Sequence, residues 1–241
     1  RFHAVIPPLA IAGTAISIRV PAATNLTLSD LQAMGFMNST MHSILTQIID
    51  SQKSFLISGG TGSGKTTLLA AMLSMVDPTH RILVIEDAAE LNVVHPHLVR
   101  VQSRLANSEG LGQVTMTDLV RQSLRMRPDR IIIGEVRGRE ISDLLLALNT
   151  GHNGSATTIH ANNVYAVPSR IEALGLLSGL PREAIHTQMI TAFEYVIQLS
   201  DFQDTKRSIA SIAKLTPDSN GFAEIEVLVD STITHPMHLA A

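Results

Sequence analysis

Short runs of consecutive apolar residues alternate, along the middle of the chain, with segments in which apolar residues recur every three or four positions. The continuous apolar runs lie at 55–57, 82–85 and 131–133. Runs of this kind predict strands that are covered on both faces, as in a parallel sheet. The segments with helical spacing are 65–75, 117–127 and 139–149. Their alternation predicts an α/β fold with a doubly wound, mostly parallel sheet.

The pattern continues toward both ends of this region. Downstream, strands are expected at 156–160, 195–199, 208–215 and 222–229 and helices at 167–177 and 182–193. Upstream, Thr27 and Asp30 predict the start of a short helix that ends at Gly35, and a second helix is expected at 39–50.

Residues 1–33 differ from the rest, with strand-like apolar runs at 4–6 and 15–20 around a loop that contains two prolines. Because the first residue is Arg1 rather than methionine, we expect the sequence to be a piece of a longer chain. The expected division is a remnant of an N-terminal domain with its linker at 1–34 and the main α/β domain at 35–241.

Composition narrows the functional classes. The 241 residues are 45% hydrophobic and 16% charged with a formal net charge of -3, as in ordinary globular domains. There is no cysteine, which excludes a disulfide framework, a thiolate zinc site and a cysteine nucleophile. Aromatic residues make up only 3%, and together with the acidic balance this disfavours a nucleic-acid partner. The longest uncharged stretch, 2–18, is shorter than a bilayer-spanning helix.

A glycine-rich segment follows the first expected sheet strand. Residues 59–66 read Gly-Gly-Thr-Gly-Ser-Gly-Lys-Thr and fit the phosphate-loop pattern G-x-x-x-x-G-K-[ST] between a strand and a helix. Glycines let consecutive backbone N–H groups turn inward around a phosphate. Lys65 would place an ammonium at the β- and γ-phosphates, and Thr66 a hydroxyl on Mg²⁺. The candidate nucleotide-binding residues of the loop are Gly60, Thr61, Gly62, Ser63, Gly64, Lys65, Thr66 and Thr67.

Two other interpretations of this segment are weaker. A plain flexible turn would not need the Lys-Thr pair that opens the following helix. A dinucleotide-binding loop would need a G-x-G-x-x-G register, which is absent, and has no role for Lys65. The loop therefore predicts binding of a nucleoside triphosphate.

Acidic residues follow two of the expected strands, Glu86 after 82–85 and Glu135 after 131–133. The carboxyl ends of parallel strands converge on the ligand crevice of a doubly wound sheet. Nucleotide hydrolysis needs a carboxylate that orients or deprotonates water and a group that holds Mg²⁺. Either glutamate could activate water while the other serves the metal, and our expected metal ligands are Thr66 and Glu135.

A histidine and an arginine complete the candidate catalytic set. His160 lies at the end of the strand expected at 156–160, where its imidazole could donate to a γ-phosphate oxygen and sense hydrolysis. Arg104 is one of several arginines that could neutralise the γ-phosphate of a neighbouring subunit.

These blocks, in this order, resemble the secretion ATPase superfamily, the motors of type II and type IV secretion and of pilus assembly. The phosphate loop, 85–91, 129–135 and 151–160 match its Walker A, Asp box, Walker B and His box. More closely, 1–19, 85–91, 124–130 and 149–152 resemble the CpaF-type ATPases of tight-adherence (Flp) pili.

The resemblance implies a RecA-like P-loop NTPase domain that uses ATP and Mg²⁺ in a hexameric ring. It also implies a cytoplasmic location, peripheral to the inner membrane through a platform protein of the pilus or secretion system. Within the motifs, Glu135 matches the Walker B glutamate, Glu86 the Asp-box glutamate assigned as general base and His160 the His-box histidine. Arg19 resembles an arginine of the N-terminal domain that lies near the nucleotide.

The leading hypothesis is thus an ATP-hydrolysing motor for pilus assembly or protein secretion. An ATPase of a conjugative or effector-secreting type IV system is the alternative with the same chemistry. A nucleic-acid translocase is disfavoured by the composition. A nucleotide-gated scaffold that barely hydrolyses ATP is disfavoured because both candidate glutamates, Glu86 and Glu135, are present.

Overall fold

The computed structural model describes residues 2–18, 20, 25–200 and 207–231, and these contain a small hairpin and one large sheet. The hairpin pairs β1 (Phe2–Val5) with β2 (Ala15–Ile18). The large sheet has the strand order β10-β9-β8-β3-β7-β6-β4-β5. Its strands are β3 (Phe55–Ser58), β4 (Ile82–Glu86), β5 (Leu98–Gln102), β6 (Arg130–Ile133), β7 (Ala156–Ile159), β8 (Tyr195–Leu199), β9 (Ile209–Pro217) and β10 (Ala223–Asp230).

The strands from β8 to β5 run parallel, and only β9 and β10, within the part of the chain described, join this sheet antiparallel. The helices are α1 (Leu28–Ala33), α2 (Ser39–Asp50), α3 (Lys65–Leu73), α4 (Met116–Ser123), α5 (Glu140–Leu148), α6 (Val167–Leu177) and α7 (Arg182–Ala192). The expected α/β fold with a mostly parallel, doubly wound sheet is confirmed.

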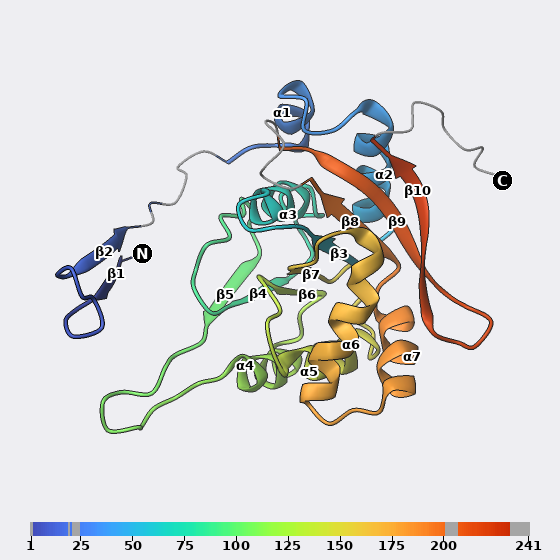
Figure 1. Cartoon of the computed structure of the whole chain (residues 1–241). Coiled ribbons are helices and arrows are strands. Elements are labelled where there is room, and N and C mark those ends of the chain that lie inside the picture. Colours follow the sequence, from blue (N-terminus) through green and yellow to red (C-terminus); the bar gives the residue numbers. More distant parts are fainter. Residues whose placement is uncertain (1, 19, 21–24, 201–206, 232–241) are drawn as a thin grey trace.

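Helices cover both faces of the sheet, with α1 to α3 on one side and α4 to α7 on the other (Figure 1). Successive strand residues point to opposite faces, so Phe55 and Ile57 join the core beneath α1 to α3 while Leu56 joins the other core. Because both faces of the central strands are buried, apolar residues predominate on both faces, and polar residues such as Ser58 and Thr157 are the exceptions. This explains the continuous runs in the sequence.

The strand β5 was not predicted. It forms an edge of the sheet, and its residues are half-buried or exposed. An edge strand with one partner needs no continuous apolar run, so Leu-Val-Arg-Val-Gln did not stand out.

The helix expected at 117–127 is shorter than predicted. α4 ends at Ser123, a 3₁₀ turn follows at Leu124–Met126, and Arg127 adopts a left-handed conformation with φ of 50°. Pro128 has no amide hydrogen and disfavours the helical region for the residue before it. The proline therefore stops the helix early.

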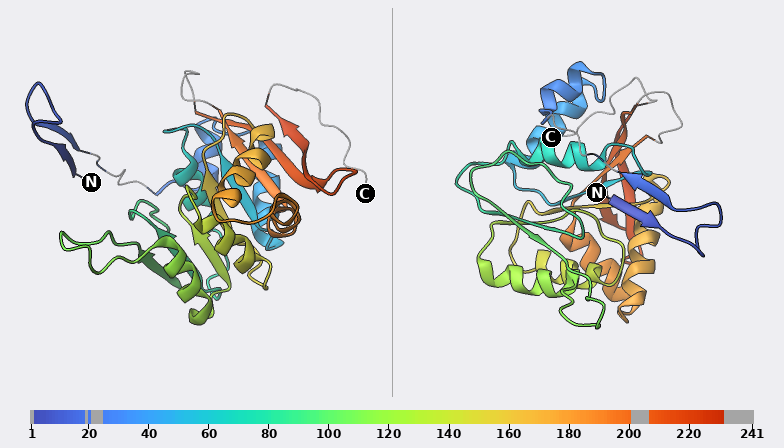
Figure 2. Two further views of the ribbon diagram at one scale, coloured as in Figure 1. Left: turned by 60° about the horizontal axis from the view of Figure 1, so that its bottom comes forward. Right: turned by 90° about the vertical axis from the view of Figure 1, so that its left-hand side faces the viewer.

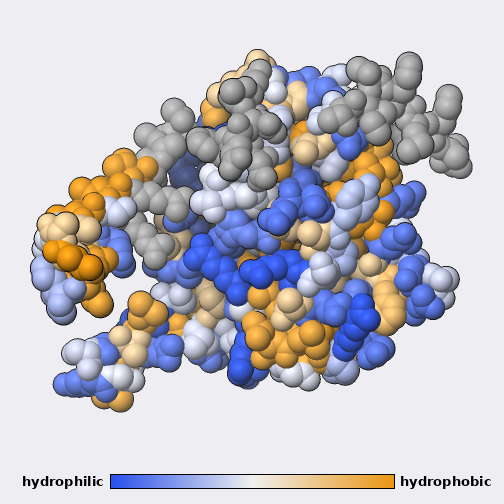
Figure 3. All heavy atoms as spheres, in the orientation of Figure 1, coloured by the Kyte–Doolittle hydropathy of each residue, from blue (hydrophilic) through white to orange (hydrophobic). Residues whose placement is uncertain are grey.

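The N-terminal hairpin lies apart from the main body, as Figure 1 and the left view of Figure 2 show. Almost all of its side chains are exposed, and its apolar residues form an orange patch on the left of the space-filling view (Figure 3). α1, by contrast, buries Leu28 and Leu31 in the same core as α2 and α3. The division after residue 34 stays a prediction, although α1 packs with the main body. Among the described residues, no helix combines the length and apolarity needed to cross a bilayer.

Candidate active site

Four parallel strands bring the candidate site together at their carboxyl ends. β3, β7, β6 and β4 are neighbours in that order, and their carboxyl ends lie in register. The phosphate loop follows β3, His160 follows β7, Glu135 follows β6 after one glycine, and Glu86 ends β4. Motifs up to a hundred residues apart in the sequence therefore meet at one place.

The glycines of the loop are required by its backbone. Gly59 has a φ of 150°, and a Cβ there would lie 2.9 Å from Ser63 Oγ and 3.1 Å from Leu199 Cβ. Gly64, with a φ of 103°, is the left-handed residue that leads into α3. The N-terminus of α3 thus opens at the loop, where its free N–H groups suit a phosphate. Thr61, Gly62 and Thr67 are exposed, Gly60, Gly64 and Thr66 are half-buried, and Ser63 is buried.

Lys65, the first residue of α3, is buried against its own loop. Its Nζ donates to the carbonyl oxygens of Gly59 at 2.8 Å and Gly60 at 2.7 Å, and it lies 3.3 Å from His160 Nδ1. Burial lowers the pKa of Lys65 below its usual value, against the attraction of Glu135. A cation held in this way gains stabilisation when an anion such as a phosphate arrives.

His160 connects Lys65 to Glu135. Its Nε2 lies 2.9 Å from Glu135 Oε1, on the opposite side of the ring from Lys65. Because the ammonium can only donate, Nδ1 must accept, which assigns the ring proton to Nε2. Burial and the positive charge of Lys65 lower the pKa of His160, so the imidazole is neutral at pH 7.

Glu135 contacts both Arg137 and His160 at the carboxyl ends of the strands. Its Oε2 accepts from the Arg137 guanidinium at 2.8 Å, while Oε1 is buried without a hydrogen bond of good geometry to any described residue. Burial alone would raise the pKa of Glu135, but Arg137, His160 and Lys65 outweigh it and lower the pKa. The side chain is therefore an ionised carboxylate, with Oε2 held by Arg137 and Oε1 facing the His160 ring.

Arg137 is a site residue that the motifs did not indicate. It donates to Glu135 and, at 3.1 Å, to Asp87 just after β4, so it bridges two strand ends. The hydrogen bond to Glu135 raises the pKa of Arg137 further above its usual range. Its position two residues after Glu135 was the available signal.

Glu86 lies in a different environment. Oε1 accepts from the backbone N–H groups of Glu90 and Leu91 at 2.9 and 2.7 Å, and Oε2 pairs with Arg100 of β5 at 3.0 Å. The side chain is almost fully buried. In this conformation Glu86 orders the segment after β4, and no contact joins it to the phosphate loop within the described residues.

The predicted metal ligands fit Mg²⁺. Within the parts of the chain described, no cluster of three His, Cys, Asp or Glu side chains could hold a metal alone. Mg²⁺ does not need one, since it is commonly held by one or two carboxylates, substrate phosphates and water. The ionised Glu135 carboxylate, whose buried Oε1 makes no hydrogen bond of good geometry, and the Thr66 hydroxyl at the start of α3 are oxygen ligands of the right kind.

The structure places only one of the two predicted arginines, and that one lies away from the site of this chain. Arg19 lies outside the described residues. Arg104 lies on the segment 103–114, which projects from the body at the lower left of Figure 1, and its Nε donates to the Gly112 carbonyl oxygen at 2.6 Å. A bridge between Arg104 and Val114 closes this segment into a loop.

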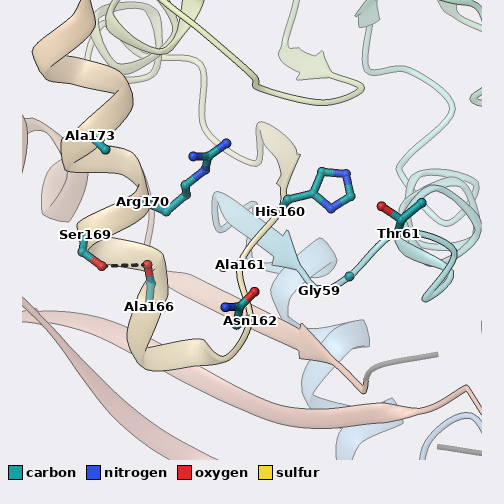
Figure 4. Close-up of a pocket in the computed structure, with 10 residues that line it drawn as sticks. Gly59, Thr61, His160, Ala161, Asn162, Ala166, Ser169, Arg170 and Ala173 are labelled. Atoms are coloured by element: carbon teal, nitrogen blue, oxygen red, sulfur yellow. Dashed lines mark hydrogen bonds between the residues drawn. The ribbon is translucent and has the colours of Figure 1, made fainter. Parts of the chain in front are cut away.

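An open cavity of about 590 Å³ lies beside the phosphate loop. Gly59, Gly60 and Thr61 line one side, and His160 with the two following residues forms the floor. The facing wall is α6, from which Ser169, Arg170 and Ala173 contribute (Figure 4). The volume lies in the range of small-molecule sites.

The chain resembles proteins of conjugation and type IV secretion. A Mycobacterium tuberculosis protein named for a proposed role in conjugal transfer is 51% identical over 215 residues, covering 89% of this chain and 61% of the relative. Protein VirB11 of the type IV secretion system of Bartonella quintana is 36% identical over 171 residues, covering 69% of this chain and 48% of that protein. The chain thus spans about three fifths or less of these relatives.

A solved structure and a family model agree with these relatives. The crystal structure of the VirB11 ATPase from the Brucella suis type IV secretion system, in complex with sulphate, superposes with a TM-score of 0.65 at 27% identity. The match covers 89% of this chain and 70% of that one, which supports the RecA-like assignment of the fold. The family model described as "Type II/IV secretion system protein" matches residues 2–217. The chain therefore belongs to the type II/IV secretion system protein family.

Proposed function

We propose that this chain is the ATPase domain of a motor that powers secretion or pilus assembly through Mg²⁺-dependent hydrolysis of ATP. The observation that carries the proposal is the phosphate loop at the end of β3, with Lys65, His160 and Glu135 in one chain of contacts beside it. Membership of the secretion family supports the same conclusion. The division into a remnant at 1–34 and an ATPase domain at 35–241 is part of the proposal.

In this proposal the loop amides and Lys65 bind the phosphates, and Thr66 with Glu135 holds Mg²⁺. The metal, when bound, neutralises charge that develops on the phosphate oxygens. His160 is a neutral donor through Nε2, so it can lose its contact with Glu135 and turn to a phosphate oxygen. That exchange would let the site respond to the loss of the γ-phosphate.

The two glutamates differ in the contacts that their carboxylate oxygens make. Glu135 Oε1 contacts only the His160 ring, which can turn away, whereas both oxygens of Glu86 are held by backbone N–H groups and by Arg100. We propose Glu135 as the group that serves the metal and the water in the described conformation. Glu86 can act as general base once its contact with Arg100 opens.

The cavity between the phosphate loop and α6 is open to solvent, and a ring of subunits would close it. We propose a homo-oligomer, a hexamer, in which the projecting loop 103–114 carries Arg104 to a neighbouring subunit. An arginine arriving in trans stabilises the charge of the transferring phosphoryl group. The partner would be an inner-membrane platform protein, with the ATPase at the cytoplasmic face and with no role for nucleic acid.

Two subtypes remain as candidates. The blocks at 85–91, 124–130 and 149–152 favour a CpaF-type motor of tight-adherence pili. The 51% identity to a relative named for conjugal transfer favours a conjugative type IV ATPase. Deleting the gene from its host separates them, since loss of surface pili without loss of conjugation supports the former and the reverse result supports the latter.

Turnover of ATP tests the proposal directly. Lys65→Ala should abolish ATP binding and turnover because the loop loses its ammonium at the β- and γ-phosphates. Lys53→Ala is the matched control, since Lys53 precedes β3 at the opposite end of that strand and forms a surface pair with Glu194. Turnover in Lys65→Ala equal to that of the control would contradict the assignment of this loop.

A further inference from the structure

The wall of the cavity opposite the phosphate loop carries a charged side chain that no motif includes. Arg170 lies on α6 and lines the same cavity as Gly59, Gly60 and Thr61. In Figure 4 its side chain extends from the helix into the space on the side of His160. One chain therefore supplies both walls, the loop that cradles phosphate and an arginine that faces it.

The helix that presents Arg170 is firmly anchored. Asn163 caps the 3₁₀ turn at Val164–Ala166 that leads into α6, and its side chain accepts from the backbone N–H of Ala166 at 2.9 Å. On the face away from the cavity, Val167, Ile171 and Leu174 are buried in the core beneath α4 to α7. The backbone that carries Arg170 is thus fixed, while its side chain is exposed and free to reorient.

The other cations around this edge already have partners. Arg137 is paired with Glu135 and Asp87, Arg100 with Glu86, and Lys65 with two carbonyl oxygens of its loop. Arg170 has no acidic or hydrogen-bond partner among the residues that the structure describes. Its guanidinium is the cation of the cavity that an incoming anion does not have to take from a carboxylate.

We propose that Arg170 binds the terminal phosphate of the nucleotide held by the phosphate loop of its own chain, and so distinguishes a triphosphate from a diphosphate. The loop amides hold the inner phosphates and Lys65 reaches the β- and γ-phosphates, which leaves the outer side of the γ-phosphate toward the cavity beside the loop. A guanidinium there can donate two hydrogen bonds to phosphate oxygens in a fork that an ammonium lacks. This inference rests on the proposed function, because it assumes ATP in the loop.

The test is a comparison of two nucleotide affinities in one variant. We expect Arg170→Ala to weaken binding of the non-hydrolysable analogue AMP-PNP by about tenfold or more, the size of one charge-assisted contact, and to leave ADP binding within about twofold. Arg170→Lys should recover part of the loss, since it keeps the charge without the fork. The affinities are measured by competition against a fluorescent nucleotide, in the presence of Mg²⁺.

A matched control separates this effect from a general change of surface charge. Arg121→Ala removes an exposed arginine that pairs with Asp143 on the outer side of α4 and α5, and it should change neither affinity. Equal weakening of AMP-PNP and ADP by Arg170→Ala, or no weakening of either, would overturn the inference.

Measuring the affinities at several protein concentrations shows whether Arg170 contacts the nucleotide of its own chain or that of a neighbouring subunit. The effect should be present at concentrations where sedimentation shows a monomer, because both walls of the cavity belong to one chain. An effect that appears only in oligomers would overturn the assignment to the same chain. If the unchanged protein binds neither nucleotide, the proposed function itself fails, which is distinct from every outcome above.

Discussion

Glu135 and Glu86 are chemically identical residues at the ends of neighbouring strands, yet their surroundings give them different tasks. Glu135 is ionised beside two cations, and one of its oxygens faces only the ring of His160. In Glu86, one oxygen accepts from backbone N–H groups after β4 and the other pairs with Arg100. Sequence spacing placed both at the site but could not rank them, because the ranking depends on which groups face each oxygen.

Replacing each glutamate by glutamine should therefore separate the two roles. Glu135→Gln should retain ATP binding and lose turnover by about 100-fold or more, because the amide keeps the shape but not the charge that serves metal and water. Glu86→Gln should lose turnover as strongly if Glu86 is the general base. Turnover and nucleotide affinity are measured for both variants, and normal turnover in Glu86→Gln would assign the base to Glu135 alone.

The lowered pKa of His160 makes stability depend on pH in a definite direction. In the unfolded chain this residue takes up a proton near its ordinary value of about 6.5, whereas in the folded chain burial and Lys65 delay protonation to lower pH. The unfolded state therefore binds more protons between the two values, so the contribution of His160 is complete above pH 6.5 and is lost as the pH falls.

We expect the melting temperature of the unchanged protein to fall more between pH 7.5 and 5.5 than that of His160→Gln, which lacks the titrating ring. Comparing how steeply the melting temperature of each protein changes with pH removes the contribution of the other histidines, which both proteins share. Identical slopes would show that the contacts of His160 with Lys65 and Glu135 do not hold its proton off in solution.

At the scale of elements, uniform burial made the central strands readily predictable. β3, β4 and β6 are covered on both faces, and their continuous apolar runs identified them and their polar ends. β5 is half-exposed at the sheet edge and was missed, and α4 ends before its expected limit because Pro128 follows. The missed strand thus lacks a continuous apolar run, and the misplaced helix end lies where a proline follows the helical spacing.

The residues of the candidate site differ in the same way in how far the sequence could predict them. The phosphate loop, the two glutamates and His160 follow strands directly, so finding the strands located them together. Arg137 and Arg170 come from a loop and from a helix face, whose direction depends on how these elements pack on the sheet. No spacing rule connects Arg170 to Gly59, since the proximity of α6 to the loop is a tertiary property.

At the scale of the whole molecule, the open site and the projecting loop predict that activity depends on assembly. A single RecA-like domain leaves one side of the γ-phosphate exposed, and catalysis rises strongly when an arginine arrives there from a neighbour. The loop 103–114 extends away from its own site and presents Arg104, while Leu105 and Leu111 on it are 85% and 63% exposed. A head-to-tail contact through such a loop closes naturally into a ring.

We therefore expect this chain to hydrolyse ATP slowly as a monomer and to turn over faster per subunit as its concentration rises and rings form. Sedimentation and turnover measured on the same samples check this, with Arg104→Ala expected to remove the rise while leaving monomer turnover unchanged. If a monomer has a specific activity that stays constant at every concentration and equals that of a longer form of the protein, the site is complete within one chain and the shared-site ring is wrong.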